Sequence, residues 1–250
     1  VHAERFAPFL LLLEDMSVDY DVGDQVLGAT VEQAERIVDT FADMHARWWA
    51  RPELAAMTWL PRPNAPQYVA AVPGIYRAGL AVLEADWADR VPSAAIDVAR
   101  AVDPCFEELL ERTAGGPWTL VHSDTRLDNI FFEKNGDGIA VIDFQLALRG
   151  RAVADIAYLV GTSMAHEVGR EHWEGLLRRW HGAVSALGVT DYSFDDALRH
   201  YREAAMYYLS GAMSLLGTFD AGNERGAAMV HAYATRSLNH VVDIDAQSVL

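Results

Sequence analysis

The stretch that most constrains the fold of this 250-residue chain is residues 120–145, LVHSDTRLDNIFFEKNGDGIAVIDFQ. It alternates short apolar runs with polar residues, and each apolar run is typical of a β-strand. We expect strands at 118–122, 129–133 and 139–143. The turn NGDG between the last two indicates a hairpin, because Asn-Gly and Asp-Gly accept the backbone angles of tight turns. The sequence therefore predicts a small β-element that holds a polar loop.

The rest of the chain is predicted to be mainly helical. Thr30 and Gln33 form a capping box, and the apolar residues of 34–48 after it follow helical spacing, so one face of this helix is core. Residues 9–13, FLLLL, are predicted to be a buried strand. The other expected features are an irregular loop around Pro61, Pro63 and Pro66, helices at 74–90, 93–113 and from 152 onward, and breaks near 188–193 and 218–223.

Composition excludes some partners. The 36 acidic and 20 basic residues give a net charge of −16, which argues against nucleic acid, because phosphate backbones require clustered Lys and Arg. The apolar run at 9–13 is too short to span a bilayer, and no secretory leader pattern opens the sequence, so we expect no membrane association. A single cysteine, Cys105, fits a reducing compartment. We therefore expect a cytoplasmic protein.

The polar residues of the loop suggest phosphoryl-transfer chemistry. The predicted hairpin returns Asp143 to the side of Asp124 and Asn129, so that three oxygen-bearing groups converge at the end of the small sheet. Such oxygen ligands suit Mg²⁺, which is held by few protein groups and keeps water and substrate phosphates. An Asp beside a metal site of this kind can accept a proton from a hydroxyl group.

These residues resemble a known group of enzymes. HSDTRLDN fits the pattern H-x-D-x-x-x-x-N, and IDFQ stands where kinases have the Asp of D-F-G. Together with the later ADIAYL, they resemble the small-molecule kinases of the aminoglycoside phosphotransferase and choline-kinase group. LLLEDM near the front and FADMHARWW in the first helix favour its ecdysteroid-kinase-like branch. The resemblance extends over essentially the whole chain and implies an α+β, protein-kinase-like fold, with ATP and Mg²⁺ as cofactors.

The resemblance implies a role for each residue of the loop. Asp124 resembles the catalytic base that receives the proton of a small-molecule alcohol acceptor, and Arg126 lies where kinases keep a cation near the γ-phosphate. Asn129 and Asp143 resemble the two Mg²⁺ ligands. Ser123 stands where this group more usually has Gly, so we expect its backbone not to need a positive φ.

The resemblance also implies residues for nucleotide binding and for support of the loop. Glu14 and Met16 stand where the hinge backbone would hydrogen-bond adenine, with Phe131 and Ile142 as its apolar floor. His122 is similar to a residue that braces the loop. Asp155 resembles a buried acid that ties the loop to the helix behind it.

A kinase of this group also needs a first lobe, with a glycine-rich loop and a strand lysine that grip the phosphates. The sequence has no G-x-G-x-x-G, and its only lysine, Lys134, lies in the hairpin. We expect residues 1–16 to be a remnant of that lobe, comprising its last strand and the hinge, and 17–250 to be the helical C-terminal lobe. A truncated record is favoured over a separately supplied lobe or a degenerate gene, and this chain alone is expected to be inactive.

Other functions stay open. A non-catalytic nucleotide-binding or interaction module would explain the missing lobe. A protein kinase is disfavoured, because no A-P-E follows Asp143 and helix signals begin soon after it. A metal-dependent hydrolase using His122, Asp124 and Asp143 lacks a second His at ligand spacing. The helices at 50–115 and beyond 190 are expected to form the acceptor site, and their Trp, Tyr and Met content suggests a fairly apolar acceptor.

Overall fold

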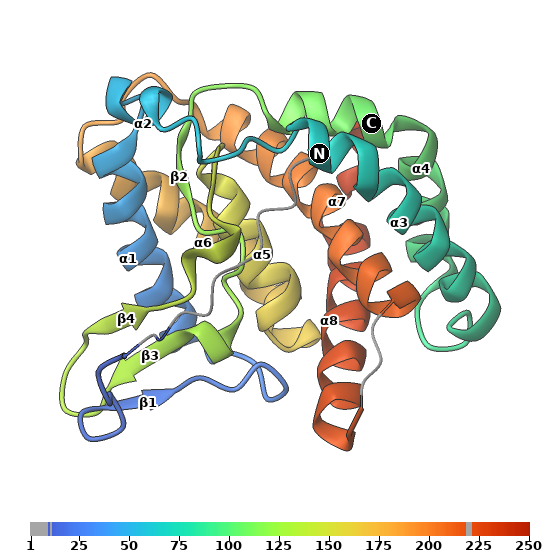
Figure 1. Cartoon of the computed structure of the whole chain (residues 1–250), viewed down its shortest axis with the longest axis horizontal. Helices are drawn as coiled ribbons and strands as arrows, with labels where there is room; N and C mark the ends of the chain where they lie inside the picture. Colours follow the sequence, from blue (N-terminus) through green and yellow to red (C-terminus); the bar gives the residue numbers. More distant parts are fainter. Residues whose placement is uncertain (1–9, 11, 219–221) are drawn as a thin grey trace.

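A computed structural model describes residues 10, 12–218 and 222–250, and most of these residues are helical (Figure 1). The helices are α1 (Val31–Trp48), α2 (Pro52–Ala56), α3 (Pro66–Asp86), α4 (Ser93–Thr113), α5 (Val153–Ser163), α6 (His166–Ala186), α7 (Phe194–Thr218) and α8 (Glu224–Asp243). Three short 3₁₀ turns cover Leu127–Asn129, Phe144–Leu146 and Ala246–Val249. Within the described ranges, none of the helices is long and apolar enough to cross a membrane.

The β-structure consists of two small antiparallel sheets. Its strands are β1 (Tyr20–Val22), β2 (Thr119–Val121), β3 (Ile130–Glu133), β4 (Ile139–Val141) and β5 (Leu148–Gly150). The predicted hairpin is confirmed: β3 pairs with β4, and Ile130 lies opposite Val141. β1 pairs with the other edge of β3, whereas β2 pairs with β5 in a separate sheet. The α+β class, with a small β-element inside a helical chain, agrees with the prediction.

Helix α1 begins as its sequence predicted. The Thr30 hydroxyl accepts a hydrogen bond from the amide of Gln33 at 3.1 Å, and the Gln33 side chain accepts one from the amide of Thr30 at 3.0 Å. This capping box satisfies two amides that the first helical turn leaves without partners. The apolar face of α1 is buried, including Ile37 and Phe41, so the spacing gave the correct core face.

Helix α3 differs from its prediction at both ends. It runs from Pro66 to Asp86 instead of 74–90, and Pro73 lies inside it. Proline is well tolerated at a helix start, because the first amides have no partner within the helix and the ring fixes a helical φ. Pro66 thus opens this helix, whereas the sequence analysis had assigned it to an irregular loop.

The predicted buried strand at 9–13 is wrong for the residues that the structure describes. Leu10, Leu12 and Leu13 lie outside any strand, and their exposed fractions are 84%, 85% and 75%. Within the described part of the chain no strand pairs with them, and a strand without a hydrogen-bonded neighbour has little to stabilise it. Strands β1 and β5 were missed because segments this short show no periodicity.

Two central helices set the position of the loop. α7 packs against α3, α4, α5 and α8, and its Tyr201, Met206 and Leu209 are fully buried. α5 is buried on all sides, from Val153 to Ser163 apart from Ala154. A helix that is apolar all round belongs in the core. Polar side chains on α5 therefore face other protein groups, and three of them, Asp155, Tyr158 and Ser163, reach the predicted loop.

Candidate active site

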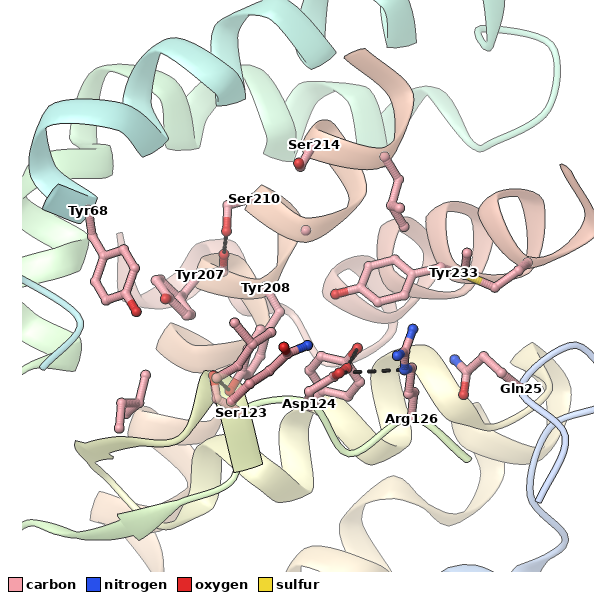
Figure 2. A pocket seen from close by; sticks show the side chains of 17 residues that line it. Gln25, Tyr68, Ser123, Asp124, Arg126, Tyr207, Tyr208, Ser210, Ser214 and Tyr233 are labelled. Atoms are coloured by element: carbon pink, nitrogen blue, oxygen red, sulfur yellow. Dashed lines mark hydrogen bonds and ion pairs between the residues drawn. The ribbon is translucent and has the colours of Figure 1, made fainter. Parts of the chain in front are cut away.

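The loop from His122 to Asn129 joins β2 to β3 and borders a hollow of about 400 Å³ (Figure 2). Asp124 and Arg126 are the charged residues among those that line it. Five tyrosines also line it, and we call it the tyrosine-lined hollow: Tyr68 on α3, Tyr158 on α5, Tyr207 and Tyr208 on α7, and Tyr233 on α8. Figure 2 shows α3, α7 and α8 facing the loop across the hollow.

Both carboxylate oxygens of Asp124 accept hydrogen bonds. The Tyr158 hydroxyl donates to Oδ1 at 2.8 Å, and the Asn129 side-chain amide donates to Oδ2 at 3.0 Å. Burial raises the pKa of Tyr158 well above its ordinary value, so its hydroxyl keeps the proton that it donates. The carboxylate is therefore fixed in one orientation at the wall of the hollow.

Arg126 is the cation nearest to Asp124. Its Nε lies 3.4 Å from Oδ2 of Asp124, and this Nε has no hydrogen-bond partner among the described residues. About a third of the side chain is exposed, and it lines the same hollow. The predicted catalytic pair, Asp124 and Arg126, is thus brought together.

Asp155 lies behind the loop, in the first turn of α5. Its Oδ2 accepts from the amide of His122 and its Oδ1 from the amide of Ser123, both at 2.8 Å. His45 on α1 also reaches Oδ2, at 3.0 Å, and the indole of Trp180 donates to the other His45 nitrogen. His45 therefore carries its proton on Nε2 and donates it to Asp155. Three helices, α1, α5 and α6, thus hold the loop backbone.

His122 connects the loop to the hairpin. Its Nδ1 accepts from the amide of Asp124 at 3.2 Å, which leaves Nε2 as the donor to the carbonyl of Ile142 at 2.9 Å. Ile142 directly precedes Asp143, and its amide donates to the carbonyl of Asn129 at 3.0 Å. One imidazole thus links the predicted base to the strand end that bears a predicted metal ligand.

The expectation for Ser123 is wrong. Its φ is +66°, a left-handed conformation that L residues rarely adopt. Two contacts hold it there: its amide donates to Asp155, and its hydroxyl lies 3.3 Å from that of Tyr208. A side chain is tolerated because these neighbours fix the backbone, although the positive φ would favour glycine.

Asn129 and Asp143, the predicted metal ligands, retain oxygen atoms for a cation. Among the described residues, both hydrogen bonds of the Asn129 side chain are made by its nitrogen, to Asp124, and its amide oxygen has no partner. Asp143 is half-buried, with φ +63°, and one oxygen accepts from Gln145 at 3.3 Å. No group of three or more His, Cys, Asp or Glu in the described ranges could hold a metal by itself.

The four predicted nucleotide-site residues line one hollow. It has about 590 Å³, is bordered by residues 13–17, 20–22, Phe131 and Ile142, and is here called the N-terminal hollow. Glu14, Met16, Phe131 and Ile142 are all among its lining residues. In the part of the chain that the structure describes, neither the Met16 amide nor the Glu14 carbonyl makes a hydrogen bond. These backbone groups are available to a ligand.

Sequence reasoning missed several lining residues of the tyrosine-lined hollow. The sequence predicted an acceptor site from the helices at 50–115 and beyond 190, and α3, α7 and α8, which lie in these ranges, do line this hollow. It did not single out Tyr158 or Gln25. The hint for Tyr158 was its place three residues after Asp155, which puts both side chains on one face of α5.

Comparisons with known proteins agree with the sequence resemblance. A model of the ecdysteroid kinase-like family matches residues 1–187. Among solved structures, an ethanolamine kinase from Plasmodium vivax is 14% identical, covers 88% of this chain and has a TM-score of 0.49. A macrolide 2'-phosphotransferase type I is 18% identical, covers 80% and has a TM-score of 0.45. The chain spans 65% and 58% of those two proteins. No curated protein sequence matches it.

Proposed function

The chain belongs to the ecdysteroid kinase-like family, and from that membership we propose that it provides the catalytic loop of a small-molecule phosphotransferase. The reaction is transfer of the γ-phosphoryl group of ATP to a hydroxyl group of a small, fairly apolar alcohol, with Mg²⁺ as the cation. The observation that supports this most strongly is Asp124, a buried carboxylate held by Tyr158 and Asn129 at the wall of a ligand-sized hollow.

Asp124 acts as the base in this proposal. An acceptor hydroxyl in the tyrosine-lined hollow would donate its proton to the carboxylate as its oxygen bonds to the γ-phosphorus, and the bond from that phosphorus to the departing ADP oxygen breaks. Tyr158 and Asn129 prevent the carboxylate from rotating, which keeps its accepting oxygen aimed at the substrate. Arg126 lies close enough to Asp124 to stabilise negative charge on the transferred group.

The residues present fit Mg²⁺ and ATP. Asn129 has a free amide oxygen and Asp143 a carboxylate, the hard oxygen donors that Mg²⁺ prefers when substrate phosphates complete its shell. A bound Mg²⁺ would neutralise phosphate charge during transfer. The N-terminal hollow offers the free Met16 amide and Glu14 carbonyl, with Phe131 and Ile142 as apolar surfaces for an adenine ring.

The proposal is tested with Asp124→Asn. This change removes the base and keeps the shape of the side chain, so phosphoryl transfer should fall by about 100-fold or more. Because this chain alone is expected to be inactive, the assay uses the full-length protein with its first lobe, incubated with Mg-ATP labelled at the γ-phosphate and a panel of sterols, amino alcohols and sugars. Binding of Mg-ATP is measured in parallel by calorimetry and should be nearly unchanged.

The matched control is Asp137→Asn. Asp137 is an exposed acid in the turn between β3 and β4, so its loss changes the net charge equally and leaves the loop intact. Equal activity of Asp124→Asn and Asp137→Asn would overturn the base role. Tight Mg-ATP binding without transfer to any alcohol would favour a non-catalytic nucleotide-binding module instead.

A further inference from the structure

The only lysine of the chain, Lys134, makes an unusual set of contacts. It lies directly after β3, and its Nζ donates to the carbonyl of Ser17 at 2.7 Å and to that of Val18 at 3.2 Å. Its own backbone amide donates to the carbonyl of Asp19 at 2.9 Å. One residue therefore holds three successive carbonyls of a turn that is more than a hundred positions earlier in the sequence.

That turn forms part of the N-terminal hollow. Met16 and Ser17 line the hollow, and Met16 starts the turn, because its carbonyl accepts from the amides of Asp19 and Tyr20. Val18 is exposed at the tip of the turn and contributes no core packing. The polar contacts of Lys134, and the pairing of β1 with β3, are what fix this side of the hollow.

Lys134 is poorly suited to bind phosphate directly. An ammonium group has three donors, and the carbonyls of Ser17 and Val18 occupy two of them. The carboxylate of Asp21 lies 3.7 Å from the same nitrogen and attracts its positive charge. All of these contacts direct the ammonium group of Lys134 toward the turn and the start of β1.

We propose that Lys134 is a positioning residue for the nucleotide, which fixes the turn 16–19 so that the Met16 amide is presented to the adenine ring. This inference rests on the proposed function, because it assumes that the N-terminal hollow takes the nucleotide. A turn that is ordered before binding loses less conformational entropy when the ligand arrives, and the affinity is correspondingly higher. The same strand also links the turn to the loop, since β3 starts after Asn129 and includes Phe131.

The test replaces Lys134 by Met, which keeps the length of the side chain and removes its donors. We expect the dissociation constant of Mg-ATP, measured by calorimetry, to rise about three- to tenfold, the effect of losing roughly one hydrogen-bonded contact. Hydrogen exchange of the Asp19 and Tyr20 amides, which donate to the carbonyl of Met16, should become faster in the absence of nucleotide. Lys134→Arg retains donors to the carbonyls and should bind within about twofold of the wild type.

The matched control is Arg170→Ala. Arg170 lies on the exposed face of α6, and its loss removes one positive charge from the acidic chain without touching the hollow. If this variant weakens ATP binding as much as Lys134→Met does, net charge explains the effect and the inference is overturned. The inference also fails if Lys134→Met binds as tightly as the wild type or if the Asp19 and Tyr20 amides of this variant exchange as slowly as those of the wild type. A wild-type protein that binds no Mg-ATP would instead overturn the proposed function.

Discussion

At the scale of single residues, Ser123 and Asp143 share one uncommon property. Both have positive φ values, +66° and +63°, and they flank the hydrogen bond from His122 to the carbonyl of Ile142. A left-handed backbone brings Cβ close to the next carbonyl oxygen, which costs about 1–2 kcal/mol for a residue with a side chain. These two strained residues are therefore held by hydrogen bonds, Ser123 by that of its own amide to Asp155 and Asp143 by that of His122 to the preceding Ile142.

Ser123→Gly should stabilise the protein. Glycine adopts the positive φ without strain, and the weak contact of the Ser123 hydroxyl with Tyr208 is the main loss. We expect the free energy of unfolding to increase by about 0.5–1 kcal/mol, measured by urea denaturation. Ser123→Ala, which loses the hydroxyl and keeps the strain, is the control. A glycine variant less stable than the alanine variant would show that φ at 123 is not the source of strain.

The residues that the sequence could identify are those with a fixed spacing in the chain. His122, Asp124, Asn129 and Asp143 were found in this way, because a loop and its hairpin bring them together regardless of the other helices. Tyr158 could not be found, since its hydrogen bond to Asp124 depends on where α5 packs. The catalytic role of Asp124 and the metal-binding roles of Asn129 and Asp143 stay predictions.

At the scale of secondary-structure elements, the crossing of α3 and α7 depends on glycine. A methyl group at Gly79 would overlap the backbone carbonyl of Met213, and one at Gly217, a turn further along α7, would lie 3.0 Å from the backbone nitrogen of Gly79. Helices approach this closely only where side chains are missing at the contact. The crossing brings Tyr68 of α3 and Tyr207 of α7 to the same hollow.

Gly79→Ala should therefore destabilise the protein by about 1–3 kcal/mol, because the helices must separate or bend. The control is Gly74→Ala on the same helix, where an added methyl meets no atom within 4 Å. That exchange should stabilise the protein by about 0.5–1 kcal/mol through helix propensity. Thermal unfolding of the two variants measures both effects. If Gly79→Ala and Gly74→Ala were both less stable than the wild type, the cause would lie in the backbone of α3 and not in its contact with α7.

Helices were predicted better than strands, for a physical reason. The capping box of α1 and the spacing of its apolar residues are local features, so they can be recognised in the sequence without knowledge of the fold. The strand at 9–13 was predicted from apolarity alone, yet a strand needs a neighbouring strand, and none pairs with its described residues. The start of α3 was missed because Pro66 was taken as a helix breaker, whereas it lies at the helix start.

At the scale of the whole molecule, two buried histidines connect stability to pH. His200 and His240 are packed inside the helical core, where burial lowers the pKa of each imidazole to about 3. His200 contacts Tyr192 and lies near Arg151, Arg199 and Asp196, whereas His240 contacts Tyr201 and lies near His166. Both remain neutral in the folded protein at pH 7.

The unfolded chain binds protons at these histidines near pH 6.5, the ordinary value, whereas the folded protein does not until about pH 3. Between these values the unfolded state holds more protons, so the free energy of unfolding decreases as the pH falls. We expect His240→Gln to flatten this decrease between about pH 7 and about pH 4.5, as measured by urea denaturation. His231→Gln, an exposed position on the same helix α8, should leave the slope unchanged. Equal slopes for the two variants would exclude His240 as a source of the dependence.

The support of the loop and the wall facing it come from different helices. α1, α5 and α6 provide His45, Asp155 and Trp180, which fix the loop, whereas α3, α7 and α8 provide Tyr68, Tyr207 and Tyr233 opposite it. Mutations on α3, α7 and α8 that spare Tyr208, whose hydroxyl contacts Ser123, can thus accumulate without changing the contacts of His45, Asp155 and Trp180. In the proposed phosphotransferase, such a division would let a lineage acquire new small-molecule targets over evolutionary time while the reacting group stays unchanged. A directed-evolution library that varies only α3, α7 and α8 would change the wall of the hollow and keep His45, Asp155 and Trp180, which hold the loop.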